Sequence, residues 1–76
     1  MAKYQYVSAD GRVVNIYDYA VMLATADGNR YVTVEAETYK QAEEYAKNIV
    51  INNEPYLEAM GKICVVMTDR KQPATI

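Results

Sequence analysis

The sequence predicts a small α+β protein in which one amphipathic helix packs on one face of a small antiparallel sheet, with the elements in the order β-β-β-α-β. Three observations predict this fold. Two Asp-Gly pairs, Asp10-Gly11 and Asp27-Gly28, separate segments rich in β-branched and aromatic residues. A helix-start motif, Thr38-Tyr39-Lys40-Gln41, follows them, and an apolar run at residues 63–67 comes after the helix.

The first hairpin is predicted around Asp10-Gly11. Aspartate and glycine both tolerate positive φ, which the two-residue turns of hairpins require. A two-residue turn at this pair places Val7 opposite Val14 and Gln5 opposite Ile16.

Two arrangements of the next segment stay open. If residues 13–25 form one uninterrupted strand, Tyr17 lies on the core face with Tyr19, because side chains alternate along a strand. The tyrosines of the first hairpin are then core residues, and the opposite face holds Val7, Val14 and Ile16. A bulge or bend near Tyr17-Asp18-Tyr19 would exchange the two sets.

The second hairpin is predicted around Asp27-Gly28. A two-residue turn there gives the pairs Leu23–Val32, Val21–Val34 and Tyr19–Ala36. Because these six residues are all apolar or aromatic, we interpret their face as the core face. The opposite face carries Ala20, Met22, Ala24, Tyr31, Thr33 and Glu35.

A helix is predicted to begin at Thr38 and to end before Pro55. Thr38 is typical of an N-cap, and Gln41, three residues later, completes a capping box. One side of the helix carries residues at helical spacing, namely Tyr39, Ala42, Ala46, Ile49, Val50 and Asn53. Pro55 is expected to open a short second helix that ends before Gly61.

The final strand is predicted over residues 62–68. Cys64 lies in its apolar run, so we interpret this lone cysteine as a buried, small hydrophobic residue. We place a single domain at residues 1–68 and expect residues 69–76, which are polar and contain Pro73, to form a flexible tail.

The side chains that commonly carry chemistry are few. The chain has no histidine, one cysteine and no glycine-rich phosphate loop, so the usual neutral-pH proton shuttle and the commonest metal ligand are missing. We therefore expect no enzyme activity, no cofactor and no metal site. Eight basic and ten acidic residues give a net charge of −2, a balance that argues against strong nucleic-acid binding.

The hydropathy of the chain predicts no membrane partner. No apolar run approaches the ~20 residues of a membrane-spanning helix. Residues 1–6 lack the hydrophobic stretch of a secretory signal. We expect a cytoplasmic protein.

The uncovered face of the sheet is the predicted functional surface, because one helix can cover only one face. On either arrangement of residues 13–25 that face carries large apolar or aromatic side chains, which usually mark an interface. The eight tyrosines suit a protein-binding surface, and they also suit half-buried strand positions without any function. The candidate partner-binding residues are Tyr4, Tyr6, Tyr17, Asp18, Arg30 and Tyr31.

Residues 31–38, followed by Gln41-Ala42 and Ala46, resemble a strand-to-helix unit of small phage-encoded proteins of the anti-CRISPR type. The resemblance covers a short part of the chain. It implies a stoichiometric inhibitor that sterically blocks a large bacterial defence complex in the host cytoplasm. The strand order and helix start also resemble antitoxins of the HicB type, although residues 30–36 lack the Pro-Gly-Cys-like stretch of that family.

Three functional hypotheses follow from these observations. The first is a non-catalytic inhibitor or adaptor that binds another protein through the uncovered sheet face. The second is a homodimeric structural or antitoxin-like module that buries the same face between two copies. The third is a weak single-strand nucleic-acid accessory whose tyrosines stack on bases.

Overall fold

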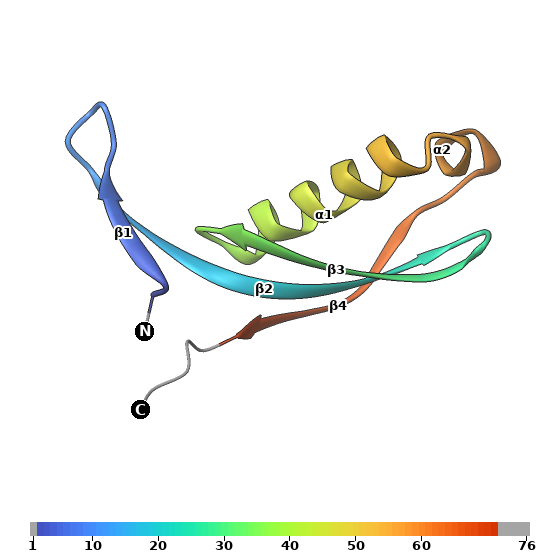
Figure 1. Ribbon diagram of the computed structural model, residues 1–76, viewed down its shortest axis with the longest axis horizontal. Coiled ribbons are helices and arrows are strands. Elements are labelled where there is room, and N and C mark those ends of the chain that lie inside the picture. The colour runs from blue at the N-terminus through green and yellow to red at the C-terminus, as the bar shows by residue number, and fades with distance from the viewer. Residues whose placement is uncertain (1, 72–76) are drawn as a thin grey trace.

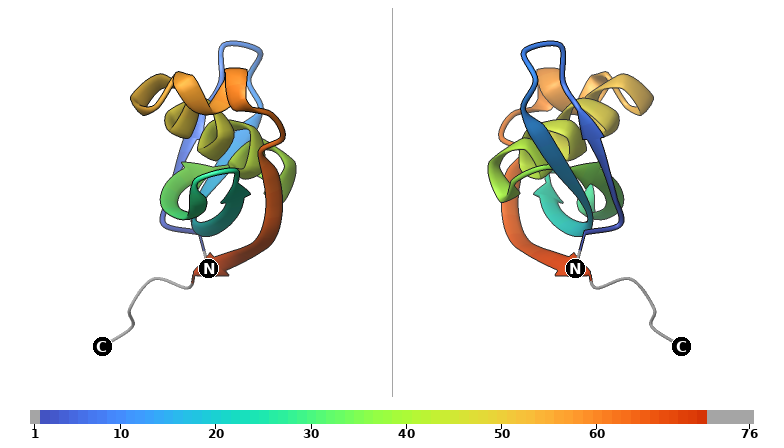
Figure 2. Two further views of the ribbon diagram at one scale, coloured as in Figure 1. Left: turned by 90° about the vertical axis from the view of Figure 1, so that its right-hand side faces the viewer. Right: turned by 90° about the vertical axis from the view of Figure 1, so that its left-hand side faces the viewer.

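The computed structural model describes residues 2–71 and contains a four-stranded antiparallel sheet with two helices on it (Figure 1). The elements are β1 (Tyr4–Val7), β2 (Val13–Thr25), β3 (Gly28–Ala36), α1 (Tyr39–Asn53), α2 (Tyr56–Met60) and β4 (Cys64–Lys71). The predicted α+β class and the order β-β-β-α-β are confirmed, with the short helix α2 before the last strand. Both helices lie on the same side of the sheet, along its concave face (Figures 1 and 2).

β2 is the central strand of the protein. Its first part pairs with β1, and its remaining part pairs with β3 and with β4, all antiparallel. The core lies between β2, β3 and the helices. It consists of Tyr19, Val21, Leu23, Val34, Ala36, Ala42, Ala46, Val50 and Leu57.

The predicted register of the first hairpin is wrong by one residue, since Val7 pairs with Val13 and Tyr6 with Val14. The loop contains three residues between Ser8 and Arg12, whose backbone groups are hydrogen-bonded at 2.9 Å. Only glycine takes positive φ in the described residues, and Gly11 supplies it with φ 83°. The chain therefore makes a turn that ends in a left-handed glycine, which adds a third residue to the loop.

Burial along β2 combines features of the two arrangements that the sequence left open. Val14 and Ile16 are buried, as the arrangement with a bulge or bend expects. Val7 is exposed and Tyr17 packs against the core, as the uninterrupted strand expects. The register between β2 and β3 is unbroken from Tyr17 onward, so no bulge in that ladder accompanies the change.

The second hairpin is displaced by two residues from its predicted register, with Tyr19 opposite Val34 and Val21 opposite Val32. Its loop is Ala26-Asp27. Within this hairpin only Gly28 takes a positive φ (107°), whereas a turn centred on Asp27-Gly28 would require one at Asp27 as well. A shift of two residues keeps every side chain on its predicted face. The predicted core face of this hairpin is thus correct although each pairing is not.

α1 begins as the sequence predicts. The Thr38 hydroxyl accepts a hydrogen bond from the Gln41 amide at 3.2 Å, and the Gln41 side chain accepts one from the Glu37 amide at 3.1 Å. Ala42 and Ala46 are fully buried, and two such small residues let the helix lie close to the sheet. Tyr39 and Ile49, predicted on the same stripe, are partly exposed at its borders.

The structure of β4 differs from the sequence-based expectations on the C-terminal tail and on Cys64. It runs from Cys64 to Lys71, so residues 69–71 belong to the sheet rather than to a tail, while residues 72–76 of that expected tail lie outside the described residues. The strand continues along β2 through Thr68 and Arg70, which pair with Val21 and Tyr19 and so lie on the helix side. Cys64 is exposed rather than buried, because it pairs with Ala24 on the side of the sheet opposite the helices.

Tyr19 joins the end of β4 to the start of α1. Arg70 donates hydrogen bonds from Nε and Nη2 to the Tyr19 hydroxyl at 3.1 and 3.0 Å, and its guanidinium lies 4.0 Å from the centre of the Tyr17 ring. The Tyr19 hydroxyl donates to the carbonyl of Glu37 at 3.4 Å. The ring of Tyr39 packs edge-on against that of Tyr19, with centroids 5.0 Å apart. Tyr19 is fully buried, so this contact set closes one end of the core.

We expect Tyr19→Phe to lower the free energy of unfolding by about 1–3 kcal/mol, because it removes the buried hydroxyl between Arg70 and the Glu37 carbonyl. Arg70→Ala should also destabilise the protein, and the double variant should lose less than the sum of the two single losses. Chemical denaturation of the four proteins measures this coupling, with Lys71→Ala as a control on the same strand. Additive losses would show that the hydroxyl and the guanidinium act independently.

Candidate functional site

The candidate site is the face of the sheet that the helices leave uncovered, which we call the outer face. Cross-strand pairing defines it, since paired residues of antiparallel strands project to the same side. Met22 pairs with Tyr31 and Met67, and Asp18 pairs with Glu35. Its exposed or half-buried members include Tyr4, Tyr6, Asp18, Ala20, Met22, Tyr31, Thr33, Glu35, Cys64 and Met67. The buried Val14 and Ile16 share this side through their pairs with Tyr6 and Tyr4.

The middle of the outer face is apolar. Tyr31 is 75% exposed and Met67 is 51% exposed, and they flank the partly buried Met22. A shallow hollow of about 110 Å³ lies among these residues and is also lined by Ala20 and Thr33. Large, flexible or aromatic side chains around a hollow provide the contact area that protein interfaces use.

One end of the outer face is polar. Lys3 Nζ lies 2.6 Å from a Glu35 carboxylate oxygen and 3.3 Å from Asp18 Oδ1, and the Tyr4 hydroxyl donates to the other Glu35 oxygen at 3.2 Å. The hydrogen bond from Lys3 holds the pKa of Glu35 below its ordinary value, and that from Tyr4 lowers it further. This cluster ties the N-terminal residues to β2 and β3.

The six predicted partner-binding residues are divided between the two sides of the sheet. Tyr4, Tyr6, Asp18 and Tyr31 lie on the outer face. Tyr17 lies on the helix side beneath the Arg70 guanidinium, and Arg30, opposite Leu23, is also on the helix side. Both Tyr17 and Arg30 are engaged in contacts within the chain.

Met67, like Cys64, is an outer-face residue that the sequence pattern did not assign to this face. Its side depends on the register of β4, which changes between its pairs with Met22 and Leu23. The extra residue is Val66, and such a bulge reverses the alternation of side chains on either side of it. Alternation within residues 62–68 therefore could not assign Met67 to the outer face.

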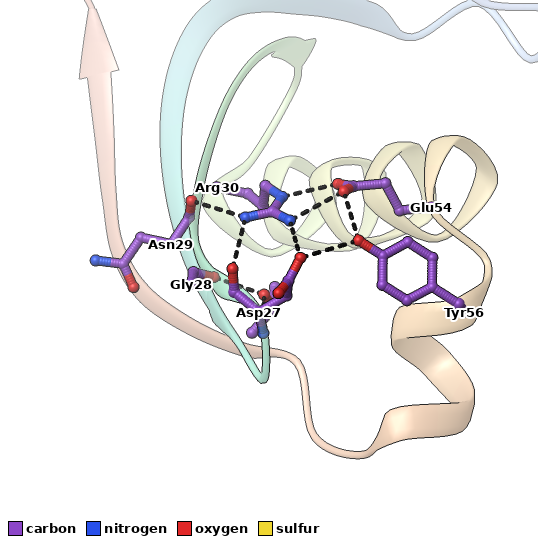
Figure 3. A network of polar contacts seen from close by, with 7 residues as sticks. Asp27, Gly28, Asn29, Arg30, Glu54 and Tyr56 are labelled. Atoms are coloured by element: carbon purple, nitrogen blue, oxygen red, sulfur yellow. Dashed lines mark hydrogen bonds and ion pairs between the residues drawn. The ribbon is translucent and has the colours of Figure 1, made fainter.

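Arg30 is the centre of a polar network at the other end of the molecule (Figure 3). Its Nε and Nη2 donate to the two carboxylate oxygens of Glu54 at 2.8 and 2.9 Å, and Nη2 also lies 3.3 Å from Asp27 Oδ2. The Tyr56 hydroxyl lies 3.1 Å from the same Asp27 oxygen and 3.2 Å from Glu54 Oε1. The network joins the β2–β3 loop to the segment between α1 and α2.

The network shifts the pKa values of Glu54 and Tyr56. The hydrogen bonds from Arg30 are the main cause that holds the pKa of Glu54 below its ordinary value. The hydrogen bond with Asp27 is the main cause that raises the pKa of Tyr56. A two-pronged guanidinium–carboxylate contact fixes both position and angle, so its role here is to orient the helical layer on the hairpin.

We expect Glu54→Gln to make stability less dependent on acid pH. Because the folded-state pKa of Glu54 lies below its ordinary value of 4.5, its ion pair contributes fully above about pH 4.5 and is lost as the pH falls through the folded-state pKa. The wild-type protein should be the more stable at pH 7, and the difference should shrink at acid pH. Thermal unfolding across this range measures it, with Glu44→Gln on the exposed side of α1 as the control. A difference that stays constant with pH would contradict the assignment.

The described residues contain no grouping that a metal would need. Within residues 2–71, no three His, Cys, Asp or Glu side chains come together as a candidate metal site. None of the helices in this part of the chain combines the length and the hydropathy needed to cross a membrane.

Comparison of the chain with protein-family models, with curated proteins and with solved structures found no match.

Proposed function

We propose that this protein is a protein-binding module that docks on another protein through the outer face. One observation carries the proposal: exposed Tyr31 and Met67, around half-buried Met22, form an apolar centre on the face opposite the helices. Exposed apolar groups gathered on one face usually mark an interaction surface. The cluster of buried residues between the sheet and the helices lies on the other side, so Tyr31 and Met67 are not needed to fill it.

The polar end of the outer face supports the same function. Lys3, Asp18 and Glu35 neutralise one another in part, and they border the apolar centre on the side of β1. An apolar centre with a polar border is the common arrangement of protein interfaces. Carboxylates on this face also disfavour a nucleic-acid backbone as the ligand.

The resemblance to anti-CRISPR proteins gives the proposal a specific form. On that reading the partner is a large bacterial defence complex, and the small sheet blocks its surface sterically. A protein of this kind needs only a complementary surface, which agrees with the small number of reactive side chains in the chain.

Affinity capture from bacterial lysate, with and without nuclease, tests the proposal. We expect a stoichiometric protein partner that survives nuclease. Tyr31→Ser and Met67→Ser should each weaken its capture about tenfold or more, because truncating a central contact of an interface usually costs that much. Met60→Ser, at the exposed end of α2, is the matched control and should leave capture unchanged.

Two outcomes would argue against the outer face. Equal capture by the wild-type protein and by both serine variants would place the partner elsewhere on the molecule. Capture that disappears with nuclease or falls steeply with salt would indicate a nucleic-acid ligand instead.

A further inference from the structure

β3 forms an edge of the sheet that carries little protection. It pairs with β2 on one side, and within residues 2–71 no strand pairs with its other side. Its nine residues keep an unbroken register and include no proline or lysine. Natural edge strands usually carry such residues or a bulge to prevent pairing with another chain. β4 has both a bulge at Val66 and a terminal lysine, Lys71.

The free edge of β3 presents main-chain groups at alternate residues. Thr25 and Gly28 close a two-residue loop, so they form a hydrogen-bonded pair, and such pairs alternate along an antiparallel ladder. The groups that point away from β2 therefore belong to Asn29, Tyr31, Thr33 and Glu35. They are placed to pair with one more strand.

A groove of about 510 Å³ lies beside this edge, between β3 and α1. Its β3 wall is Thr33, Val34 and Glu35, and its α1 wall is Tyr45, Asn48, Ile49 and Asn52. Tyr45 is 45% exposed and Ile49 is 38% exposed, although both border the core layer. A strand added to β3 would cover the main-chain groups and this apolar flank of α1 at the same time.

We propose that β3 pairs antiparallel with β3 of a second copy of this chain, about a two-fold axis at Thr33. The two sheets then become one continuous sheet, with both α1 helices on one side and both outer faces on the other. On the helix side, Val32 of one copy lies opposite Val34 of the other. On the outer face, Tyr31 lies opposite Glu35, and Thr33 lies opposite itself.

The charges and side chains of β3 favour a second copy of β3 as the strand that pairs with its free edge. Its charged residues are Arg30 and Glu35, and on this register Arg30 faces Ala36 and Glu35 faces Tyr31, so no like charges oppose each other. The Glu35 carboxylate accepts from Lys3 and Tyr4 and has free lone pairs for the tyrosine hydroxyl of the other copy.

The groove between β3 and α1 lies next to the proposed two-fold axis. Its β3 wall begins at Thr33, so the axis brings the grooves of the two copies side by side. The flanks of the two α1 helices, with Tyr45 and Ile49, then shield the joined strands. An interface of this isologous kind is the usual basis of a two-fold dimer. It uses the edge of the sheet and leaves the outer face free for another protein.

Sedimentation equilibrium of the full chain tests the dimer. We expect the wild-type protein to have twice its chain mass of 8.6 kDa at roughly 100 μM. Thr33→Pro removes an amide that faces the free edge, where proline is tolerated in a monomer. Thr33→Lys places two like charges together on the axis. Each variant should weaken dimerisation by more than about tenfold while keeping the wild-type circular dichroism.

Hydrogen exchange and an outer-face variant separate the possible interfaces. In the wild-type protein the amides of Tyr31 and Thr33 should become more protected as protein concentration rises. Met67→Lys, which adds the same charge on the outer face, should leave the dimer intact. A wild-type monomer at roughly 100 μM would overturn the proposal. A dimer that resists both Thr33 variants, or one that only Met67→Lys dissociates, would overturn it equally.

Discussion

β2 is the one element on which the rest of the structure depends, because the three other strands all pair with it. Its side-chain alternation decides what each neighbour shows to the helices and what it shows to solvent. Tyr19, Val21 and Leu23 point to the helix side and are almost fully buried. The residues between them therefore point outward, and they align Tyr31, Thr33 and Met67 beside them on the outer face. A slip of one residue in β2 would exchange the core for the proposed binding surface.

The two sides of the sheet use their polar residues differently. On the helix side, Arg70 and Arg30 make directed contacts at opposite ends of the core, with the Tyr19 hydroxyl and with the Glu54 carboxylate. The Arg70 contact ties β4 to β2 beside Tyr39 of α1, and the Arg30 contact ties the hairpin to the segment between α1 and α2. The outer face has its own charged cluster at Lys3, which leaves its centre apolar. The contacts that stabilise the domain therefore lie apart from the apolar centre that is proposed to bind another protein.

The sequence determined the fold class and the core face of the second hairpin, because a displacement of two residues leaves alternation unchanged. It predicted the α1 start because the capping signals of Thr38 and Gln41 act within four residues. The first hairpin was mispaired because one additional loop residue shifts the ladder by one and changes the faces. β4 was the least predictable element. Its bulge at Val66 and the contact between Arg70 and Tyr19 depend on residues far apart in the chain. Cys64 and Tyr17 were misplaced for this kind of reason, as their surroundings follow from the pairing and packing of distant segments. Arg30 lies on the helix side as the alternation of β3 requires, so its choice as a binding residue conflicted with the predicted faces.

The central claim is that the outer face is open, and the chain carries a native probe of it in its one cysteine. Cys64 lies on the outer face at the start of β4 and is exposed. The measurement is the alkylation rate of this thiol in the native protein, compared with the rate in denaturant, across a range of protein concentrations. We expect the two rates to agree within about tenfold at every concentration, because α1 and α2 both lie on the opposite side of the sheet. Strong protection in the dilute native protein would contradict the account, since it would mean that the outer face is covered by the chain itself.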